Sequence, residues 1–287
     1  MKKNRFSVFD LLIYVILIVI IICILFPLLH VVAVSFSSAK YIFTNDITIY
    51  PKGFNVEVYK WILRDPKIYN AYKNTLYYVS LGTVLSLIAT STGAYALSKK
   101  KLVFRKKFMG AIILTMFFSG GMIPSFLTIK NLGIYNTTWA VVLPGLVSSW
   151  YLIVMKSFFE AFPGEIEESG ELDGLNDIGT FWYLVLPVSK PVLAAIGLFY
   201  AVGLWNSYYT PFIYLDSQNK FPLQLILRSL LVQGQGLEGR AGQSDQPVIL
   251  ESIKYATIIV SVVPIIIVYP FLQKYFVTGV LVGSIKG

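Results

Sequence analysis

EIEESGELDGLNDIGTFWYLVLP, residues 165–187, is the stretch that decides the fold. Its run EESGELDG (167–174) holds four of the chain's 15 acidic residues, although the rest of the chain is largely apolar and basic. The residues before Gly174 suit a helix, and Gly174 permits the positive φ that ends one. Asn176 is a residue type that favours the start of a second helix. The stretch therefore predicts a helix, a turn and a helix with an exposed acidic rim, a shape that fits a groove on a soluble partner.

The composition of the whole chain places it in a lipid bilayer. Of its 287 residues, 56% are hydrophobic and 14% are charged, whereas soluble domains carry roughly 25% charged residues. A helix needs about 20 mainly apolar residues to cross the roughly 30 Å hydrocarbon core. We therefore predict an all-α membrane protein with six transmembrane helices in a single domain, 1–287. The predicted spans are 11–34, 71–98, 108–129, 137–156, 191–215 and 255–274.

Basic residues set the expected orientation. Lys2, Lys3 and Arg5 precede the first span, whose apolar run of about 24 residues is too long for a signal peptide. A dense basic hinge at 99–107 joins the second and third spans. Because cytoplasmic loops carry an excess of Lys and Arg, both termini, the hinge and the acidic loop at 160–190 are expected in the cytoplasm. The same bias accounts for the net charge of +9 without a nucleic-acid partner.

Two longer segments, 35–70 and 216–254, are expected outside the membrane. The first should contain a short interfacial helix that carries Trp61. The second begins with the amphipathic FPLQLILRSLL and continues into a polar, glycine-rich run at 233–246, which predicts a loop. That loop is either an ordinary linker or an arm that reaches toward an extracellular partner.

The predicted spans contain no deep Asp, Glu, Lys or Arg. Ion-coupled transporters and proton pumps depend on such intramembrane charges, so energy for transport is expected from another subunit. The sequence has no phosphate-binding loop of the form GxxxxGK[ST], no His/Cys cluster of metal-ligand spacing and no Ser/His/Asp set. We therefore predict that the chain is not an enzyme, holds no metal and binds no cofactor of its own.

The stretch 165–187 resembles the EAA loop of ABC importer permeases. That motif reads E-A-A, three residues, G, nine residues, I, one residue and L-P. Its positions are occupied here by Glu168, Ser169, Gly170, Gly174, Leu184, Leu186 and Pro187. Ser and Gly replace the two alanines and keep their small size, but Gly weakens a helix by ~1 kcal/mol relative to Ala.

Two further stretches narrow the resemblance to the carbohydrate-uptake branch of these permeases, the MalG and LplC type. They are FFSGGMIPSFLTIKNLGIYNTTWAVVLPG (117–145) and YPFLQKYFVTGVLVGSIKG (269–287). Together with the EAA loop, they extend the resemblance over nearly the whole chain. The resemblance implies the MetI-like permease fold, with a cytoplasmic coupling helix in the EAA loop, in the cell membrane.

The resemblance also implies partners and a mechanism. This subunit would lie in membrane lipid beside a second, homologous permease, above an ATPase dimer that binds ATP and Mg²⁺. An extracellular solute-binding protein would deliver a sugar, expected to be an oligosaccharide. Each EAA loop would dock in an ATPase cleft and transmit its motion to the spans. The residues expected to couple this chain to the ATPase are Glu167, Glu168, Ser169, Gly170, Asp173, Gly174, Leu186 and Pro187.

Two groups of residues are candidates for the translocation pathway. The glycine–proline group of the third span is Gly120, Gly121 and Pro124, and the aromatic group of the fifth span is Trp205, Asn206, Tyr208 and Tyr209. The glycine–proline group marks either a kink packed between helices or a broken helix that lines the pathway. The aromatic group suits sugar binding, but such residues also anchor helices at the membrane surface. The residues alone leave both choices open.

Two other classes of function stay open at this point. One is a secondary transporter or channel that acts without an ATPase, which the absence of deep charges disfavours. The other is a membrane scaffold that binds a partner through the acidic loop and moves no substrate. The sequence does not identify the sugar, and oligomers of uronic acids and host-glycan fragments are both compatible with it.

Overall fold

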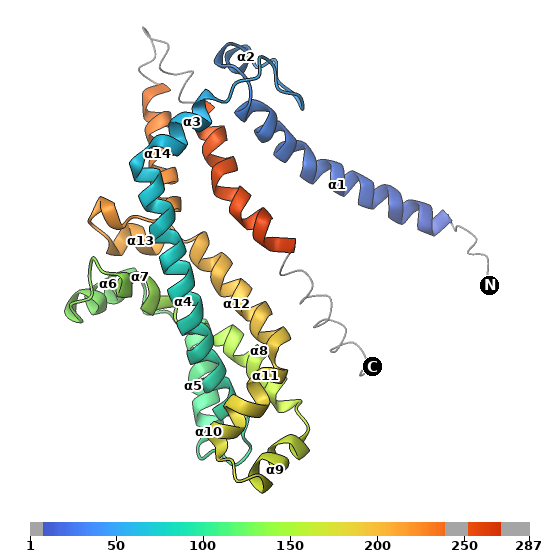
Figure 1. Cartoon of the computed structure of the whole chain (residues 1–287), viewed down its shortest axis with the longest axis vertical. Coiled ribbons are helices and arrows are strands. Elements are labelled where there is room, and N and C mark those ends of the chain that lie inside the picture. The colour runs from blue at the N-terminus through green and yellow to red at the C-terminus, as the bar shows by residue number, and fades with distance from the viewer. Residues whose placement is uncertain (1–7, 239–251, 271–287) are drawn as a thin grey trace. The chain divides into compact units, whose positions relative to one another are not determined.

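Helices account for all regular secondary structure in the described part of the chain (Figure 1). The structure is a computed structural model that describes residues 8–238 and 252–270. The all-helical class predicted from the sequence is confirmed for these residues. They fall into two compact units, which are 8–69 with 227–238 and 252–264, and 70–226 with 265–270.

The elements up to Asn131 include two of the longest helices. They are α1 (Val8–Ser35), α2 (Ala39–Phe43), α3 (Glu57–Arg64), α4 (Pro66–Ser98), α5 (Arg105–Phe117) and α6 (Met122–Asn131). The elements that follow are α7 (Thr138–Val142), η1 (Leu143–Gly145), α8 (Ser149–Glu160), α9 (Gly164–Leu172), α10 (Asp177–Thr180), the π-helix η2 (Phe181–Val185), α11 (Leu186–Val188), α12 (Lys190–Trp205), α13 (Tyr209–Tyr214), η3 (Gln218–Lys220) and α14 (Leu223–Glu238). A further helix covers Ser252–Pro270.

Up to six helical segments of the described chain are long and apolar enough to cross a membrane. Three are single helices: Phe9–Ser35 of α1, α4 and Ser252–Pro270. The other three are bent pairs: α5 with α6 at 116°, α7 and η1 with α8 at 54°, and α10–α11 with α12 at 83°. The number agrees with the six spans predicted from hydropathy, but the three pairs are not straight helices.

Two of the spans end or break where the sequence supplies glycine or a polar side chain. The α5–α6 break covers 118–121, where Gly121 has φ +82°, a conformation that residues with a side chain rarely adopt. Helix α12 ends at Trp205, whereas the predicted fifth span extends to Leu215. Asn206 caps α12, and α13 then forms a separate short helix.

Helix α14 is longer than the sequence indicates. It starts where Thr75 Oγ1 accepts a hydrogen bond from the Leu223 amide at 2.8 Å, and it continues to Glu238. The loop predicted at 233–246 is therefore wrong for 233–238, and its remainder lies outside the described residues. Once a helix has nucleated, each added residue costs little, so Gln, Leu and Glu extend it across two glycines.

In the first unit, the end of α1 packs against the segment that follows it. Ala33 and Val34 are buried with Ile47 in one cluster. Phe36 stacks on Tyr59 of α3, with ring centroids 4.8 Å apart. The most apolar part of α1 is not buried by the described chain, as expected of a helix that lies in lipid.

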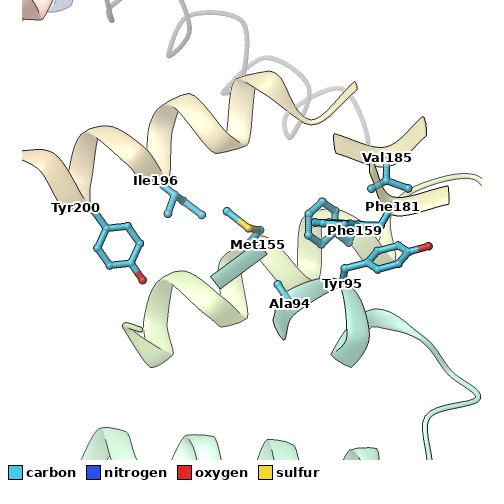
Figure 2. Packing of buried hydrophobic residues seen from close by; sticks show 8 residues of the cluster. All are labelled: Ala94, Tyr95, Met155, Phe159, Phe181, Val185, Ile196 and Tyr200. Atoms are coloured by element: carbon cyan, nitrogen blue, oxygen red, sulfur yellow. The ribbon is translucent and has the colours of Figure 1, made fainter. Parts of the chain in front are cut away.

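The core of the second unit joins α4, α8, η2 and α12 (Figure 2). The ring centroids of Tyr95 and Phe181 lie 4.9 Å apart, and Phe159 meets both rings edge-on. Met155 and Ile196 are fully buried in the same core. Aromatic pairs contribute roughly 0.5–1.5 kcal/mol beyond the area that they bury. Because Phe181 follows α10 directly, this core fastens the acidic loop to the spans.

The hydroxyl of Tyr200 satisfies the backbone at the bend before α8. It accepts a hydrogen bond from the Ser148 amide at 2.9 Å and shares another with Thr90 Oγ1 at 2.7 Å. A bend in a span frees backbone groups that lipid cannot satisfy. The buried hydroxyl supplied by α12 therefore stabilises the 54° bend.

Asn136 holds the loop between α13 and α14. Its φ is +56°, a region that Asn tolerates better than most residues. Its Oδ1 accepts the Ser217 amide at 3.2 Å, and Lys220 Nζ donates to its carbonyl oxygen at 2.6 Å. Asn74 of α4 donates to Asn219 O in the same loop at 2.8 Å. These bonds fix the loop that follows α13 to α4.

The variant Tyr200→Phe should destabilise the protein by about 1–3 kcal/mol, because the part-buried Ser148 amide loses its partner. Equilibrium unfolding of the solubilised protein measures this loss. Tyr183→Phe, at an exposed position of η2, is the matched control and should leave stability unchanged. Equal stability of Tyr200→Phe and the wild type would show that the bend does not depend on this hydroxyl.

Candidate functional site

The acidic loop forms two helices around a glycine turn. Helix α9 ends with hydrogen bonds from the Leu175 amide to Gly170 O (2.9 Å) and from the Gly174 amide to Glu171 O (3.1 Å). Together with the φ of +78° at Gly174, they form a Schellman motif. The positive φ predicted at this glycine is confirmed.

The second helix of the loop starts at an asparagine cap. Asn176 Oδ1 accepts a hydrogen bond from the Gly179 amide at 2.8 Å, which satisfies one of the free amides of the first turn. The chain continues through the π-helix η2, which places Phe181 in the core. Leu186 and Pro187 then form the last turn before the 83° bend into α12. Single π-helical turns are often found at functional sites.

Gly170 lies at the closest approach of the two helices of the loop. It is buried, and a Cβ on it would lie 2.9 Å from Thr180 Oγ1 and 3.0 Å from Leu184 Cδ1. The EAA pattern alone indicates only a weaker helix at this position. The packing gives the reason for glycine, because a side chain here would push the two helices apart.

The outer side of the loop carries both acidic and large apolar side chains. The expected coupling residues that are exposed there are Glu168, Ser169, Asp173, Gly174 and Pro187. Leu172 and Ile178 are also exposed, at 89% and 68%, and neither is among the residues expected from the motif. A leucine between two acidic residues is the sequence signal that points to it. A partner that docks on this side would cover both of these apolar side chains.

Glu167 contacts the chain itself. Its Oε1 lies 2.7 Å from Lys99 Nζ, and the same ammonium lies 4.1 Å from the centre of the Tyr95 ring. Burial lowers the pKa of Lys99, but the hydrogen bond to Glu167 and the contact with Tyr95 outweigh it and raise the pKa above its ordinary value. Lys99 is therefore charged at neutral pH. The pair joins α9 to the first residue after α4.

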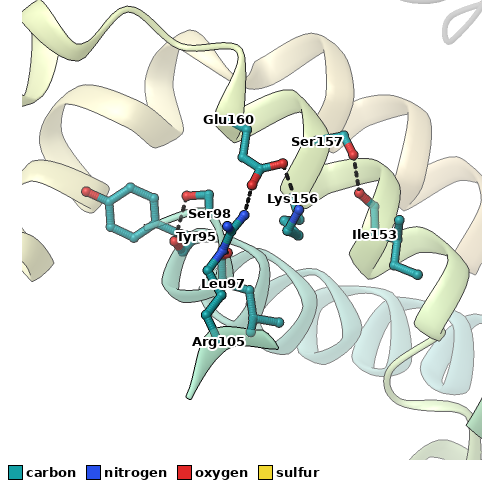
Figure 3. Close-up of polar contacts among 8 residues, drawn as sticks. All are labelled: Tyr95, Leu97, Ser98, Arg105, Ile153, Lys156, Ser157 and Glu160. Carbon is teal, nitrogen blue, oxygen red and sulfur yellow. Dashed lines mark hydrogen bonds and ion pairs between the residues drawn. The ribbon is translucent and has the colours of Figure 1, made fainter. Parts of the chain in front are cut away.

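A second set of ion pairs joins the basic hinge to α8 (Figure 3). Glu160 pairs with Arg105 and also with Lys156, whose Nζ lies 2.7 Å from Oε2. The Arg105 Nε–H donates to Leu97 O at 2.7 Å, near the end of α4. Arg105 therefore connects the ends of α4, α5 and α8.

One residue of the aromatic group contacts the helix that follows the glycines of the third span. Tyr209 donates a hydrogen bond to Met122 Sδ at 3.1 Å, directly after the α5–α6 break. Trp205 is 7% exposed and its ring centroid lies 6.3 Å from that of Tyr72, so it packs inside the unit. The other members are exposed: Gly120, Gly121, Pro124, Asn206, Tyr208 and Tyr209.

Comparison with known proteins shows the family to which this chain belongs. The family of binding-protein-dependent transport system inner membrane components matches residues 82–282. The chain belongs to this family. It is 39% identical to the polygalacturonan/rhamnogalacturonan transport system permease protein YtcP of Bacillus subtilis over 99% of this chain and 100% of that protein. Protein LplC of the same organism is 38% identical over 91% of this chain and 89% of that protein.

A solved structure has the same fold. It is the crystal structure of a bacterial ABC transporter involved in the import of the acidic polysaccharide alginate. A chain of that transporter matches this permease with a TM-score of 0.86 and 31% identity, over 96% of this chain and 100% of the other. The family resemblance based on the EAA loop and its flanking stretches is confirmed, and the chain is a membrane permease with the MetI-like fold.

Reversal of either charge in the Lys99–Glu167 pair should loosen α9. Lys99→Glu or Glu167→Lys places like charges side by side, and the double reversal should restore most of the contact. Partly exposed pairs contribute about 0.2–1 kcal/mol, so amides of α9 should exchange hydrogen up to about fivefold faster in the single variants.

Hydrogen-exchange mass spectrometry of the α9 peptide checks this expectation. Glu165→Lys, at an exposed position in the first turn of α9, is the control for the added charge. Unchanged exchange in both single variants would contradict the bracing role of the pair.

Proposed function

We propose that this chain is a transmembrane subunit of an ATP-driven importer that moves an oligosaccharide from an extracellular binding protein into the cytoplasm. Membership of a binding-protein-dependent transport family supports the mechanism. The polysaccharide transport role in the name of YtcP, and the alginate importer that shares the fold, support a sugar as the substrate.

The observation that carries this proposal is the two-sided acidic loop. Its outer side, with Glu168 and Leu172, is exposed, whereas its inner side is fixed by the Lys99–Glu167 pair and by Phe181 in the core. A displacement of the outer side would therefore move the spans, because these contacts limit deformation of the loop itself. We assign docking on an ATPase to the outer side, with Glu168 opposite a basic residue of that ATPase.

The other expected coupling residues act through the shape of the loop. Gly170 permits the close packing of its two helices, and Gly174 makes the turn between them. Leu186 and Pro187 lead into the bend before α12. Glu167 acts as an internal brace instead of a docking residue.

The α5–α6 break supports a second permease as the neighbouring subunit. The helical residues from Phe108 to Phe117 rise about 15 Å, so the break lies near the middle of a roughly 30 Å hydrocarbon core. Among the described residues, nothing lies within 4 Å of a Cβ built on Gly120 or Gly121. Irregular backbone at this depth needs protein or a water-filled path beside it. A second permease and the pathway between the two chains would provide both.

The basic hinge also supports an orientation with both termini in the cytoplasm. This orientation places the acidic loop on the side where an ATPase dimer binds ATP and Mg²⁺. The sequence has no phosphate-binding loop, so ATP hydrolysis belongs to the partner and this chain itself catalyses no reaction.

Oligomers of uronic acids are the substrate class that the comparisons favour. One relative is named for transport of polygalacturonan and rhamnogalacturonan, and the matching crystal structure concerns alginate import. Polygalacturonan and alginate are both chains of uronic acids. An importer of such oligomers would take up anionic sugars of several units.

The variants Glu168→Lys and Gly174→Pro should uncouple transport from ATP hydrolysis. Glu168→Lys reverses the charge of the docking surface, and proline cannot adopt the φ of +78° at position 174. Sugar-stimulated ATPase activity of the purified complex should fall at least about tenfold, which corresponds to ~1.4 kcal/mol of lost coupling.

Two matched variants separate docking from general damage. Glu165→Lys adds the same charge change one turn earlier on α9, and Gly174→Asn keeps a residue that tolerates positive φ. Both should retain most of the activity. Full sugar-stimulated ATPase activity in Glu168→Lys or Gly174→Pro would contradict the docking role.

Uptake of a labelled oligogalacturonide into cells should require this chain and ATP. An unlabelled uronic-acid oligomer should compete for uptake, whereas a neutral oligosaccharide of equal length should compete far less. Uptake that continues after ATP depletion but stops when ion gradients collapse would instead identify a secondary transporter.

A further inference from the structure

The basic hinge between α4 and α5 has two faces with different partners. Lys99 and Arg105 contact Glu167 and Glu160 inside the chain. The other basic residues of the hinge are exposed and form no ion pair within 8–238 and 252–270: Lys100, Lys101, Lys106 and Lys107. The acidic loop therefore leaves these four charges without a counter-charge.

Large apolar side chains lie among these four lysines. Val103, Phe104 and Phe108 are 68%, 62% and 52% exposed. Phe104 has φ +61°, which is unusual for a bulky residue, and Lys107 Nζ lies 4.8 Å from the centre of its ring. Exposure of three large apolar side chains to water is unfavourable. At the boundary between lipid headgroups and acyl chains, by contrast, the apolar side chains contact the acyl chains and the lysines contact the headgroups.

The length of the hinge fixes its depth relative to the bilayer. Only residues 99–104 separate the last residue of α4 from the first of α5. Both helices belong to candidate spans. A connection of this length therefore cannot extend far from the membrane surface. The four lysines are therefore held at the level of the headgroups.

We propose that the outer face of the hinge, Lys100, Lys101, Lys106 and Lys107 with Phe104, binds anionic phospholipid headgroups. The inference rests on the proposed orientation, in which the hinge lies at the cytoplasmic leaflet. Clusters of four or more Lys or Arg directly beside a span attract anionic lipids, by about fivefold in affinity for each residue. The lipid would supply the counter-charges that these lysines do not find in the described part of the chain.

This binding has a consequence for coupling. Lys99 and Arg105 belong to the same hinge and hold α9 and α8 through Glu167 and Glu160. A hinge anchored by lipid therefore gives the acidic loop a fixed base. Anionic lipid should raise sugar-stimulated ATPase activity of the complex as well as bind to it.

Native mass spectrometry of the purified complex, with phosphatidylglycerol as the probe and phosphatidylcholine as the neutral reference, tests the proposal. The hinge variant K100Q/K101Q/K106Q/K107Q should lose at least about a hundredfold in affinity for phosphatidylglycerol. The control K40Q/K52Q/K60Q/K67Q removes four exposed lysines from the segment expected outside, 35–70, and should retain this affinity. The ATPase activity of the complex is then measured in nanodiscs with and without phosphatidylglycerol. This lipid should raise the activity of the wild type and the control, but not that of the hinge variant.

Equal retention of phosphatidylglycerol by the hinge variant and the wild type would overturn the proposal. So would a hinge variant that keeps the lipid but loses its ATPase subunits, because the lysines would then bind protein. Lipid retention is measured without ATP or sugar, so the experiment can contradict lipid binding while the coupling role of Glu168 holds. It can equally support lipid binding while the Glu168 variants contradict the coupling role.

Discussion

The joint between the end of α4 and the acidic loop is the interaction on which the rest of this structure depends. Tyr95 takes part in it twice, since its ring packs against Phe181 in the core and also lies beneath the Lys99 ammonium. Lys99 in turn pairs with Glu167 of α9. Aromatic packing, a cation–π contact and an ion pair therefore lie within four residues of one another along the chain. Each contributes on the order of 1 kcal/mol to stability. Together they make the loop a rigid extension of the span.

The bilayer imposes a second constraint, because each backbone polar group within it needs a partner. The three bent spans meet this constraint in different ways. The bend before α8 uses the hydroxyl of Tyr200, and the bend before α12 uses Ser189, whose hydroxyl donates to Val185 O at 2.7 Å. The break at Gly120 and Gly121 uses serines from its own segment, because Ser119 Oγ accepts a hydrogen bond from the Gly121 amide at 3.2 Å and Ser125 Oγ donates to Gly121 O at 2.7 Å. Unlike the bend before α8, it has no neighbouring helix of the described chain within 4 Å of a Cβ built on either glycine. The difference agrees with a subunit that is complete only beside a second permease.

Much of the fold could be predicted from the sequence, because it depends on local composition. Apolar runs of sufficient length gave the number of candidate spans, and backbone preferences gave the turn at Gly174 and the cap at Asn176. Contacts between distant residues could not be predicted in this way. The sequence does not distinguish Glu167 from the adjacent Glu168. Only the position of Lys99 in space shows that Glu167 forms the internal ion pair while Glu168 stays exposed. The exposed Leu172 and the reason for glycine at position 170 likewise depend on packing. The glycines of the third span indicated a kink or a break, and only the structure shows the 116° break.

The proposed coupling requires that the outer side of the acidic loop contact an ATPase and transmit its motion to the spans. Site-directed cross-linking in native membranes tests it most directly, with Leu172→Cys in a Cys23→Ser background that removes the one native cysteine. A cross-link is expected from position 172 to an ATPase subunit, identified by mass spectrometry, and its yield should change when ATP is added. An active transporter that gives no such cross-link, or a cross-link whose yield is the same with and without ATP, would contradict this role of the loop.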